Sequence, residues 1–401
     1  MIFTASSLYQ VSVARLTPLQ LVLVGTMLEL SVFLFEVPTG VVADVFSRRL
    51  SIIIGYFLIG LGFILEGSIP IFWSILIAQV LWGVGYTFTS GATQAWISDE
   101  IGEVAANRAF LRSEQLGQAA ALLGIGAGVL VGSFRLNLPI QLGGFLLILL
   151  GIFLTLKMPE NGFNPTPQED RNNWQKMGKT FRDGLDMVRR RPVLSTILTI
   201  GLFYGLYSEG FDRLWTKHLL DNFVFPAIGN FQPIVWIGMM RSVGMLLSIG
   251  AAEVALRKID THSNTAIARS LLGITTFLIG SMLTFALAGR FALILAAYWI
   301  IYVARNVIGP LYTAWVNQRL DSNVRATVIS MSSQVDAIGQ VAGGPLVGLV
   351  GSLISVQAAI SLSGLLLTPV LPMFARTIKQ DSGAMPESET SPNDLPIEGQ
   401  K

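Results

Sequence analysis

The chain is 401 residues long, and 52% of its residues are hydrophobic while only 13% are charged. Soluble globular proteins carry about 25% charged residues, so this composition excludes an ordinary soluble domain and indicates a polytopic membrane protein. There is no cysteine, which excludes disulfides and thiolate metal sites. The two histidines, His218 and His262, are expected in loops, so we predict no metal site and no cofactor.

The first ten residues, Met1–Gln10, are apolar but make only half a span, and no positively charged residue precedes them. They therefore do not resemble a signal peptide. We interpret them as the outer end of a truncated first helix. Two explanations stay open: a misassigned start codon, with roughly 20 more residues encoded upstream, or a shortened variant.

Long apolar runs then follow one another along the chain. A helix needs roughly 20 apolar residues to cross a bilayer, and lipid satisfies no backbone hydrogen bonds, so each run is expected to be a helix. The fold class predicted is an all-α polytopic membrane protein with eleven full spans and one partial span. The full spans are expected at 19–41, 51–68, 71–97, 114–133, 137–156, 193–215, 232–255, 266–288, 291–316, 326–350 and 353–375.

A charged loop, PTGVVADVFSRR, joins the first two full spans at residues 38–49. It has the spacing G-x-x-x-D-x-x-x-R-[RK], and a weaker copy follows half a chain later. The motif residues are Gly40, Asp44, Arg48 and Arg49 in the first copy, and Glu253 and Arg257 in the second.

A second repeat supports a duplicated chain. A helix, a short basic loop and a Gly-rich helix occur in the same order in both halves, and the pattern indicates two parallel six-helix repeats. The matching residues are Trp96, Arg108 and Gly124 in the first half, and Trp315, Arg325 and Gly343 in the second.

The loop motif and the repeat resemble the major facilitator superfamily, and this resemblance covers essentially the whole chain. It implies two parallel six-helix halves that rock around a central site. Within the superfamily, the run EVPTGVVAD at 36–44 resembles bacterial drug and metabolite efflux proteins. However, Leu130-Val131 stand where drug antiporters carry a Gly-Pro signature on the fifth helix.

The distribution of basic residues gives the orientation. Of the 27 Lys and Arg, four are expected in outer loops, three lie within spans and 20 fall on the other side. The positive-inside rule then makes the loops 42–50, 157–192, 257–264 and 317–325 cytoplasmic. We expect a multi-pass protein of the inner membrane. Its parts would be an N-terminal membrane half at 1–156, a cytoplasmic linker with an amphipathic helix at 157–192, a C-terminal half at 193–376 and a disordered cytoplasmic tail at 377–401.

The resemblance implies that the 38–49 loop is part of a gate. Gly40 would let two helices approach closely, and Asp44 would lie against the positive N-terminal end of the helix that begins near Ala326. Arg48 or Arg49 is expected to pair with Asp99 or Glu100, at the cytoplasmic end of the fourth helix. The alternative is a static loop whose basic residues only set topology. The gating residues expected are Gly40, Asp44, Arg48, Arg49, Asp99, Glu253 and Arg257.

Charged residues inside spans are costly in lipid, so they usually face a cavity or one another. Glu29 lies near mid-bilayer, and no first-half span contains a basic residue. Glu29 is therefore a candidate proton carrier, with Glu36 on the same face and Asp336 in the second half. The alternative for Glu29 is a hydrogen bond to a polar neighbour or to the first helix.

Arg305 and Asp336 both lie near the midplane of the second half, and we expect them to pair. Interhelical pairing of this kind can be purely structural, which is the alternative to a functional role. The cavity candidates are Tyr86, Gln94, Gln115, Gln118, Tyr204, Tyr207, Glu209, Asp212, Arg213, Trp236, Arg241, Trp299, Tyr302, Arg305 and Asn306.

These features favour a secondary transporter, not an enzyme, because the chain has neither an H-E-x-x-H nor a G-x-x-x-x-G-K-[ST] motif. We expect a monomer that moves a small amphipathic molecule by proton-coupled efflux. Its partners would be the substrate, protons and the lipid bilayer, with no nucleic acid. Two alternatives stay open: uptake or facilitated diffusion of a small solute, and a transporter-like sensor that moves nothing.

Overall fold

The computed structural model describes residues 1–165, 188, 192–226, 231–261, 263–320 and 322–383, without the side chains of 322–327 and 382–383. The regular structure of these residues is helical throughout, as predicted. The proposed amphipathic helix of the linker lies outside the described residues.

Seven helices form the N-terminal half of the molecule. The second begins with a capping box, in which Thr17 accepts from the Gln20 amide and the Gln20 side chain accepts from the Thr17 amide, with Pro18 in the first turn. The helices are α1 (Ile2–Ser12), α2 (Pro18–Val45), α3 (Arg48–Ser68), α4 (Phe72–Thr89), α5 (Ala92–Ile101), α6 (Glu103–Gly132) and α7 (Leu138–Lys157).

The described helices of the C-terminal half repeat this plan. They are α9 (Pro192–Asn222), α10 (Pro233–Lys258), α11 (Asn264–Leu287), α12 (Phe291–Gln318), α13 (Ser322–Leu353), α14 (Val356–Leu366) and α15 (Val370–Gly383).

Nine stretches of the described chain are helical, long and apolar enough to cross a membrane. The predicted spans at 193–215 and 326–350, which are α9 and α13, are not among these nine. α9 carries Glu209, Asp212 and Arg213 in its sequence. Two predicted spans are interrupted. The span at 71–97 breaks at Gly91, whose φ of +69° suits glycine. The span at 353–375 breaks before Pro369, which has no N–H to donate.

Two sequence expectations differ from the structure. His218 is not in a loop but inside α9, where it is 1% exposed and its Nε2 lies 2.9 Å from the Phe285 carbonyl oxygen. α15 continues to Gly383, past the predicted start of the tail at 377. His262 and the rest of the tail lie outside the described residues.

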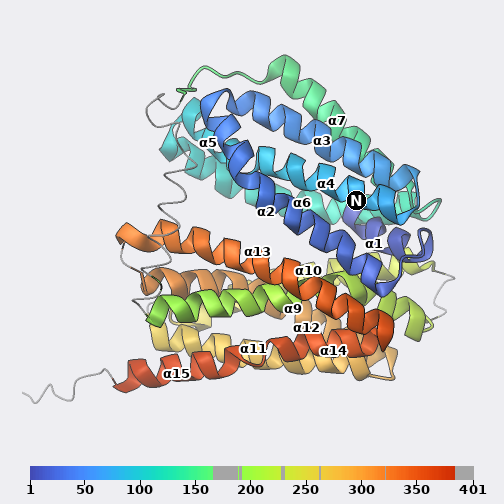
Figure 1. Cartoon of the computed structure of the whole chain (residues 1–401), viewed down its shortest axis with the longest axis vertical. Helices are drawn as coiled ribbons and strands as arrows, with labels where there is room; N and C mark the ends of the chain where they lie inside the picture. The colour runs from blue at the N-terminus through green and yellow to red at the C-terminus, as the bar shows by residue number, and fades with distance from the viewer. Residues whose placement is uncertain (166–187, 189–191, 227–230, 262, 321, 384–401) are drawn as a thin grey trace, which may run out of the picture.

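The two halves form two bundles, seen one above the other in Figure 1, with α1–α7 in one and α9–α15 in the other. Contact between them runs through α2 with α13 and α9, through α6 with α10, and through α1 with α9 and α10. In Figure 1, α2 and α13 approach each other near the end of the molecule where α1 lies and diverge toward the opposite end. We call the α1 end outer and the opposite end, with the basic loops, cytoplasmic.

Candidate functional site

Hydrogen bonds between the described parts of the two halves lie toward the outer end. The Leu19 amide donates to Ser352 Oγ at 2.9 Å, and Thr216 Oγ1 donates to Ser7 Oγ at 3.2 Å. Arg241 donates to the Phe3 carbonyl oxygen at 2.7 Å. These contacts close the outer face.

Gly25 on α2 marks the tightest point of this closure. A Cβ atom added there would lie 2.0 Å from Glu209 Oε2 and 2.2 Å from Arg213 Nε. Glu209 and Arg213 are one turn apart on α9 and form an ion pair at 3.1 Å, in which Glu209 is only 4% exposed. Only a glycine therefore lets α2 sit directly on this ion pair.

Glu29 follows Gly25 by one helical turn, so it faces the same neighbour. The charges that act on its carboxylate are those of Glu209, Arg213, Asp336 and Asp212. The basic neighbour of Glu29 therefore comes from the opposite half, and α1 carries no basic residue within Ile2–Ser12. The sequence predicted an isolated carboxylate here, and the structure places it in a mixed-charge interface.

A cavity of about 480 Å³ lies in the C-terminal half. It runs from Asp212 on α9 toward Val316 and Ile329, near the cytoplasmic ends of α12 and α13. In the orientation predicted from the basic loops, this direction corresponds to an inward-facing form. The predicted residues that line the cavity are Tyr204, Tyr207, Asp212, Arg305 and Asp336.

The predicted pairing of Arg305 with Asp336 is wrong. Arg305 instead makes a bidentate pair with Asp212, in which Nη2 lies 2.7 Å from Oδ2 and Nη1 contacts Oδ1. Asp336 accepts a hydrogen bond from Gln340 Nε2 at 2.7 Å, one turn along α13. Both pairs line the same cavity, so Arg305 still acts on Asp336 through space.

Two smaller cavities continue from Asp212 toward the outer face. One, of about 370 Å³, is lined by three further predicted residues, Arg241, Tyr302 and Asn306. The other, of about 220 Å³, lies between the halves and is lined by Phe3, Arg213 and Arg241 among others. Asp212 borders all three cavities, so its pair with Arg305 stands where they meet.

Other predicted cavity residues lie elsewhere. Trp236 is 9% exposed and packs against the rings of Phe225 and Phe291, while Trp299 donates to the Met240 carbonyl oxygen at 3.1 Å. The four candidates of the N-terminal half are exposed and line none of the three cavities. They are Tyr86, Gln94, Gln115 and Gln118.

Sequence reasoning missed Glu66 on α3, which is 1% exposed. Its carboxylate accepts hydrogen bonds from Ser6 Oγ at 2.6 Å, Gln10 Nε2 at 2.9 Å and Gln79 Nε2 at 3.1 Å. These neutral donors attach α1 to α3 and α4. A carboxylate inside the apolar run 51–68 was the signal that could have found it.

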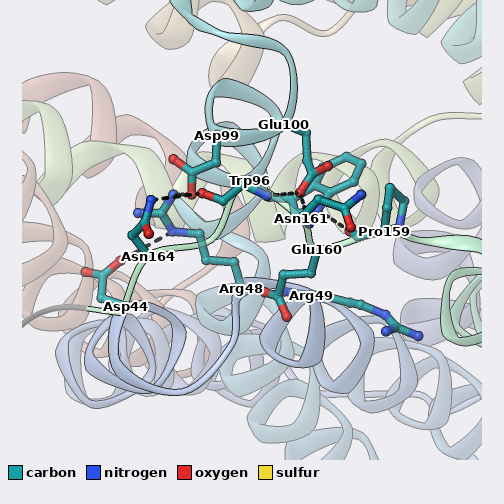
Figure 2. A network of polar contacts seen from close by, with 11 residues as sticks. Asp44, Arg48, Arg49, Trp96, Asp99, Glu100, Pro159, Glu160, Asn161 and Asn164 are labelled. Atoms are coloured by element: carbon teal, nitrogen blue, oxygen red, sulfur yellow. Dashed lines mark hydrogen bonds and ion pairs between the residues drawn. The ribbon is translucent and has the colours of Figure 1, made fainter.

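At the cytoplasmic end, the segment 38–49, which was predicted to be a loop, is helical except at Phe46 and Ser47, and a polar network holds it (Figure 2). Arg48 pairs with Asp99 at the end of α5, as the motif predicts, and its Nε lies 3.7 Å from Asp44 Oδ1. In the second-half copy, the contact that corresponds to Arg48–Asp44 lies within α10, where Arg257 Nε is 2.7 Å from Glu253 Oε1. The role of these pairs in gating stays a prediction.

The same network holds the start of the linker. Glu160 accepts from Ser47 Oγ at 2.7 Å and from the Arg49 amide at 2.9 Å, so it caps the N-terminus of α3. Glu100 accepts from the Asn161 amide at 2.6 Å, and Trp96 Nε1 donates to the Pro159 carbonyl oxygen at 2.8 Å. The predicted pairing partner Glu100 therefore holds the linker (Figure 2).

The close approach expected at Gly40 is not present in this conformation. A Cβ atom added at Gly40 would meet no described atom within 4 Å. Farther along the same helix, Thr26 and Val22 do approach Gly344 and Gly348 of α13 closely. The α2–α13 contact is therefore tight toward its outer end and open at Gly40.

Comparison with known proteins agrees with the family resemblance seen in the sequence. The family model described as Major Facilitator Superfamily matches residues 1–268. An uncharacterized MFS-type transporter, YxaM of Bacillus subtilis strain 168, is 22% identical over 363 residues, which are 88% of this chain and 86% of that protein. An uncharacterized transporter of Buchnera aphidicola, BU466, is 34% identical over 74 residues, 18% of each chain.

Solved structures share the fold at low identity. The nucleoside transporter NupG superposes with a TM-score of 0.72 at 14% identity, with 94% of each chain covered. A bacterial homolog of the human lysosomal transporter Spinster, in an inward-facing and unoccupied conformation, gives 0.68 at 13% identity over 95% of this chain and 96% of its own.

Proposed function

Because the chain belongs to the Major Facilitator Superfamily, we propose that it exports a small molecule across the cytoplasmic membrane by alternating access, in exchange for protons. The observation that carries the proposal is the position of Glu29 between the halves. Its carboxylate is influenced at once by Arg213 and Glu209 of α9 and by Asp336 of α13. A change of its charge therefore changes the electrostatic energy of the closed outer interface.

The cycle follows from these contacts. In the inward-facing form, α2 sits on the Glu209–Arg213 pair and the cavity beside Asp336 runs toward the cytoplasm. Rocking the halves would separate Gly25 from this pair and bring Gly40 toward the cytoplasmic end of α13. The Asp44, Arg48 and Asp99 contacts would stabilise one end state, so that substrate and proton cross in opposite directions.

Proton movement in liposomes reconstituted with the full chain tests the coupling. Glu29→Gln keeps the size of the side chain but cannot ionise, so transport driven by a proton gradient should fall sharply while exchange without a gradient survives. Glu36→Gln is the matched comparison and should be milder, because Glu36 lies nearer the cytoplasmic end of α2. Unimpaired gradient-driven transport by the Glu29→Gln variant would sink the proposal.

The same assay separates the alternatives. Antiport requires that adding substrate on one side moves protons from the other side, whereas symport moves both together. Facilitated diffusion gives substrate flux with no proton movement at all. A sensor would bind its ligand and show no flux in either variant.

A further inference from the structure

Among the described residues, the arginines of the cavity region have polar partners, whereas two carboxylates, Glu29 and Asp336, form no ion pair. Arg305 is held bidentately by Asp212, and Arg213 is held by Glu209. Arg241 donates to the neutral Phe3 carbonyl and lies toward the outer face. Asp336 accepts only a neutral amide donor, from Gln340. An anionic substrate in the main cavity would have to displace Asp212 to reach Arg305, the arginine that lines it.

Glu29 adds a second carboxylate from the opposite half, although it is not among the residues that line the cavity. It lies on α2 while Asp336 lies on α13, and the charge of Asp336 acts on the Glu29 carboxylate. Around Glu29 and Asp336, the charges comprise four acidic groups, Glu29, Glu209, Asp212 and Asp336, and two arginines, Arg213 and Arg305. The region therefore has an excess of negative charge, and a cation placed beside Asp336 would balance it.

The tyrosines beside Asp336 can contact a substrate with their rings, because their hydroxyls already have hydrogen-bond partners. Tyr312 donates its hydroxyl to the Ile197 carbonyl at 2.7 Å, and the Tyr204 hydroxyl lies 3.1 Å from Thr275 Oγ1. Their rings pack edge to face with centroids 5.7 Å apart, and both residues line the cavity. Aromatic faces attract cations and apolar groups, and both of these tyrosine hydroxyls already have partners.

We propose that the substrate is a monovalent organic cation, a substituted amine with an aromatic or branched aliphatic body. Its charged nitrogen lies near Asp336, on the side that faces Glu29, and its body packs on the rings of Tyr204 and Tyr312. A cavity of about 480 Å³ is in the range that holds such molecules. This inference rests on the proposed function only in taking the cavity as the transport site.

Three ligands with one ring system test the class directly: 1-naphthylmethylammonium, 1-naphthylmethanol and 1-naphthoate. Calorimetric titration of the purified full chain should show binding of the cation and weaker binding of the alcohol and the anion. Asp336→Asn should weaken binding of the cation by roughly tenfold or more, the loss expected for a charge-assisted contact. Asp221→Asn is the matched control, because Asp221 pairs with Lys217 at the outer end of α9.

A second pair of variants tests the rings. Tyr312→Phe keeps the ring and removes the hydroxyl, so it should bind the cation as the unchanged chain does. Tyr312→Leu removes the ring and should weaken binding several-fold. Melting temperatures of all variants show whether each remains folded. If Tyr312→Leu is unfolded, Tyr312→Phe still shows whether cation binding needs the hydroxyl.

Two results overturn the inference: the anion or alcohol binding as tightly as the cation, or cation affinity that stays within about twofold in Asp336→Asn. Absence of cation binding at millimolar concentration also overturns it. These failures differ from failure of the proposed function. Proton movement triggered by the alcohol would keep the transport function and remove the substrate class. Cation binding that depends on Asp336 but moves no protons would keep the substrate class and remove the proton-coupled transport function.

Discussion

Replacing Gly25 by valine should favour opening of the outer face. The Cβ atom of the new side chain would lie 2.0 Å from Glu209 Oε2 and 2.2 Å from Arg213 Nε, both in an ion pair with little room to move. Overpacking of this kind costs about 1–3 kcal/mol. The clash exists only while α2 sits on α9, so the equilibrium should shift about 5–150-fold toward the outward-facing form.

The absence of cysteine makes the assay simple, since a single introduced thiol is the only one in the chain. Thr216 is 0% exposed at the closed outer interface. Thr216→Cys should therefore react slowly with a membrane-impermeant maleimide, and Gly25→Val should accelerate the reaction at least about fivefold. Gly250→Val is the matched glycine control, because a Cβ there meets nothing within 4 Å. Equal labelling rates with and without the Gly25→Val substitution, in folded protein, would refute the reasoning.

Three further predictions concern the charged pairs. Asp44→Asn should slow turnover more than it weakens substrate affinity, measured by initial rates against equilibrium binding, because the loop lies far from the cavity; a collapse of affinity alone would contradict a gating role. Glu209→Gln should lower stability by about 3 kcal/mol, seen in chemical denaturation, since Arg213 loses a buried partner; a change within error would show that the pair is dispensable. The Asp212→Arg and Arg305→Asp double variant should recover part of the transport that each single variant loses, and strictly additive losses would argue against coupling.

The membrane architecture was predictable from the sequence because it depends on long-range composition. Apolar runs fix which segments cross the bilayer, and lipid forces them to be helical. The breaks at Gly91 and before Pro369 were not predicted, since the apolar runs continue through both. The family resemblance implied that Arg48 or Arg49 pairs with Asp99 or Glu100, and the structure shows the Arg48–Asp99 pair.

The partners of charges inside the membrane were harder to predict. Depth along a helix suggested that Arg305 would meet Asp336, but the rotation of α9 about its axis presents Asp212 to Arg305 instead. For Glu29, the decisive neighbour lies on the opposite half, where no pattern within one span can place it. Such contacts depend on helix rotation and on how the halves dock, which hydropathy does not encode.

Spin-label distances across the two faces test alternating access most directly. Exposed positions suit the labels: Ile69 with Val224 at the outer end, and Phe46 with Leu256 at the cytoplasmic end. We expect two populations, in which the outer distance lengthens as the cytoplasmic distance shortens, and Gly25→Val should enrich the outward-facing one. A single population with a short outer distance, unchanged by Gly25→Val, by pH or by 1-naphthylmethylammonium, would contradict the mechanism.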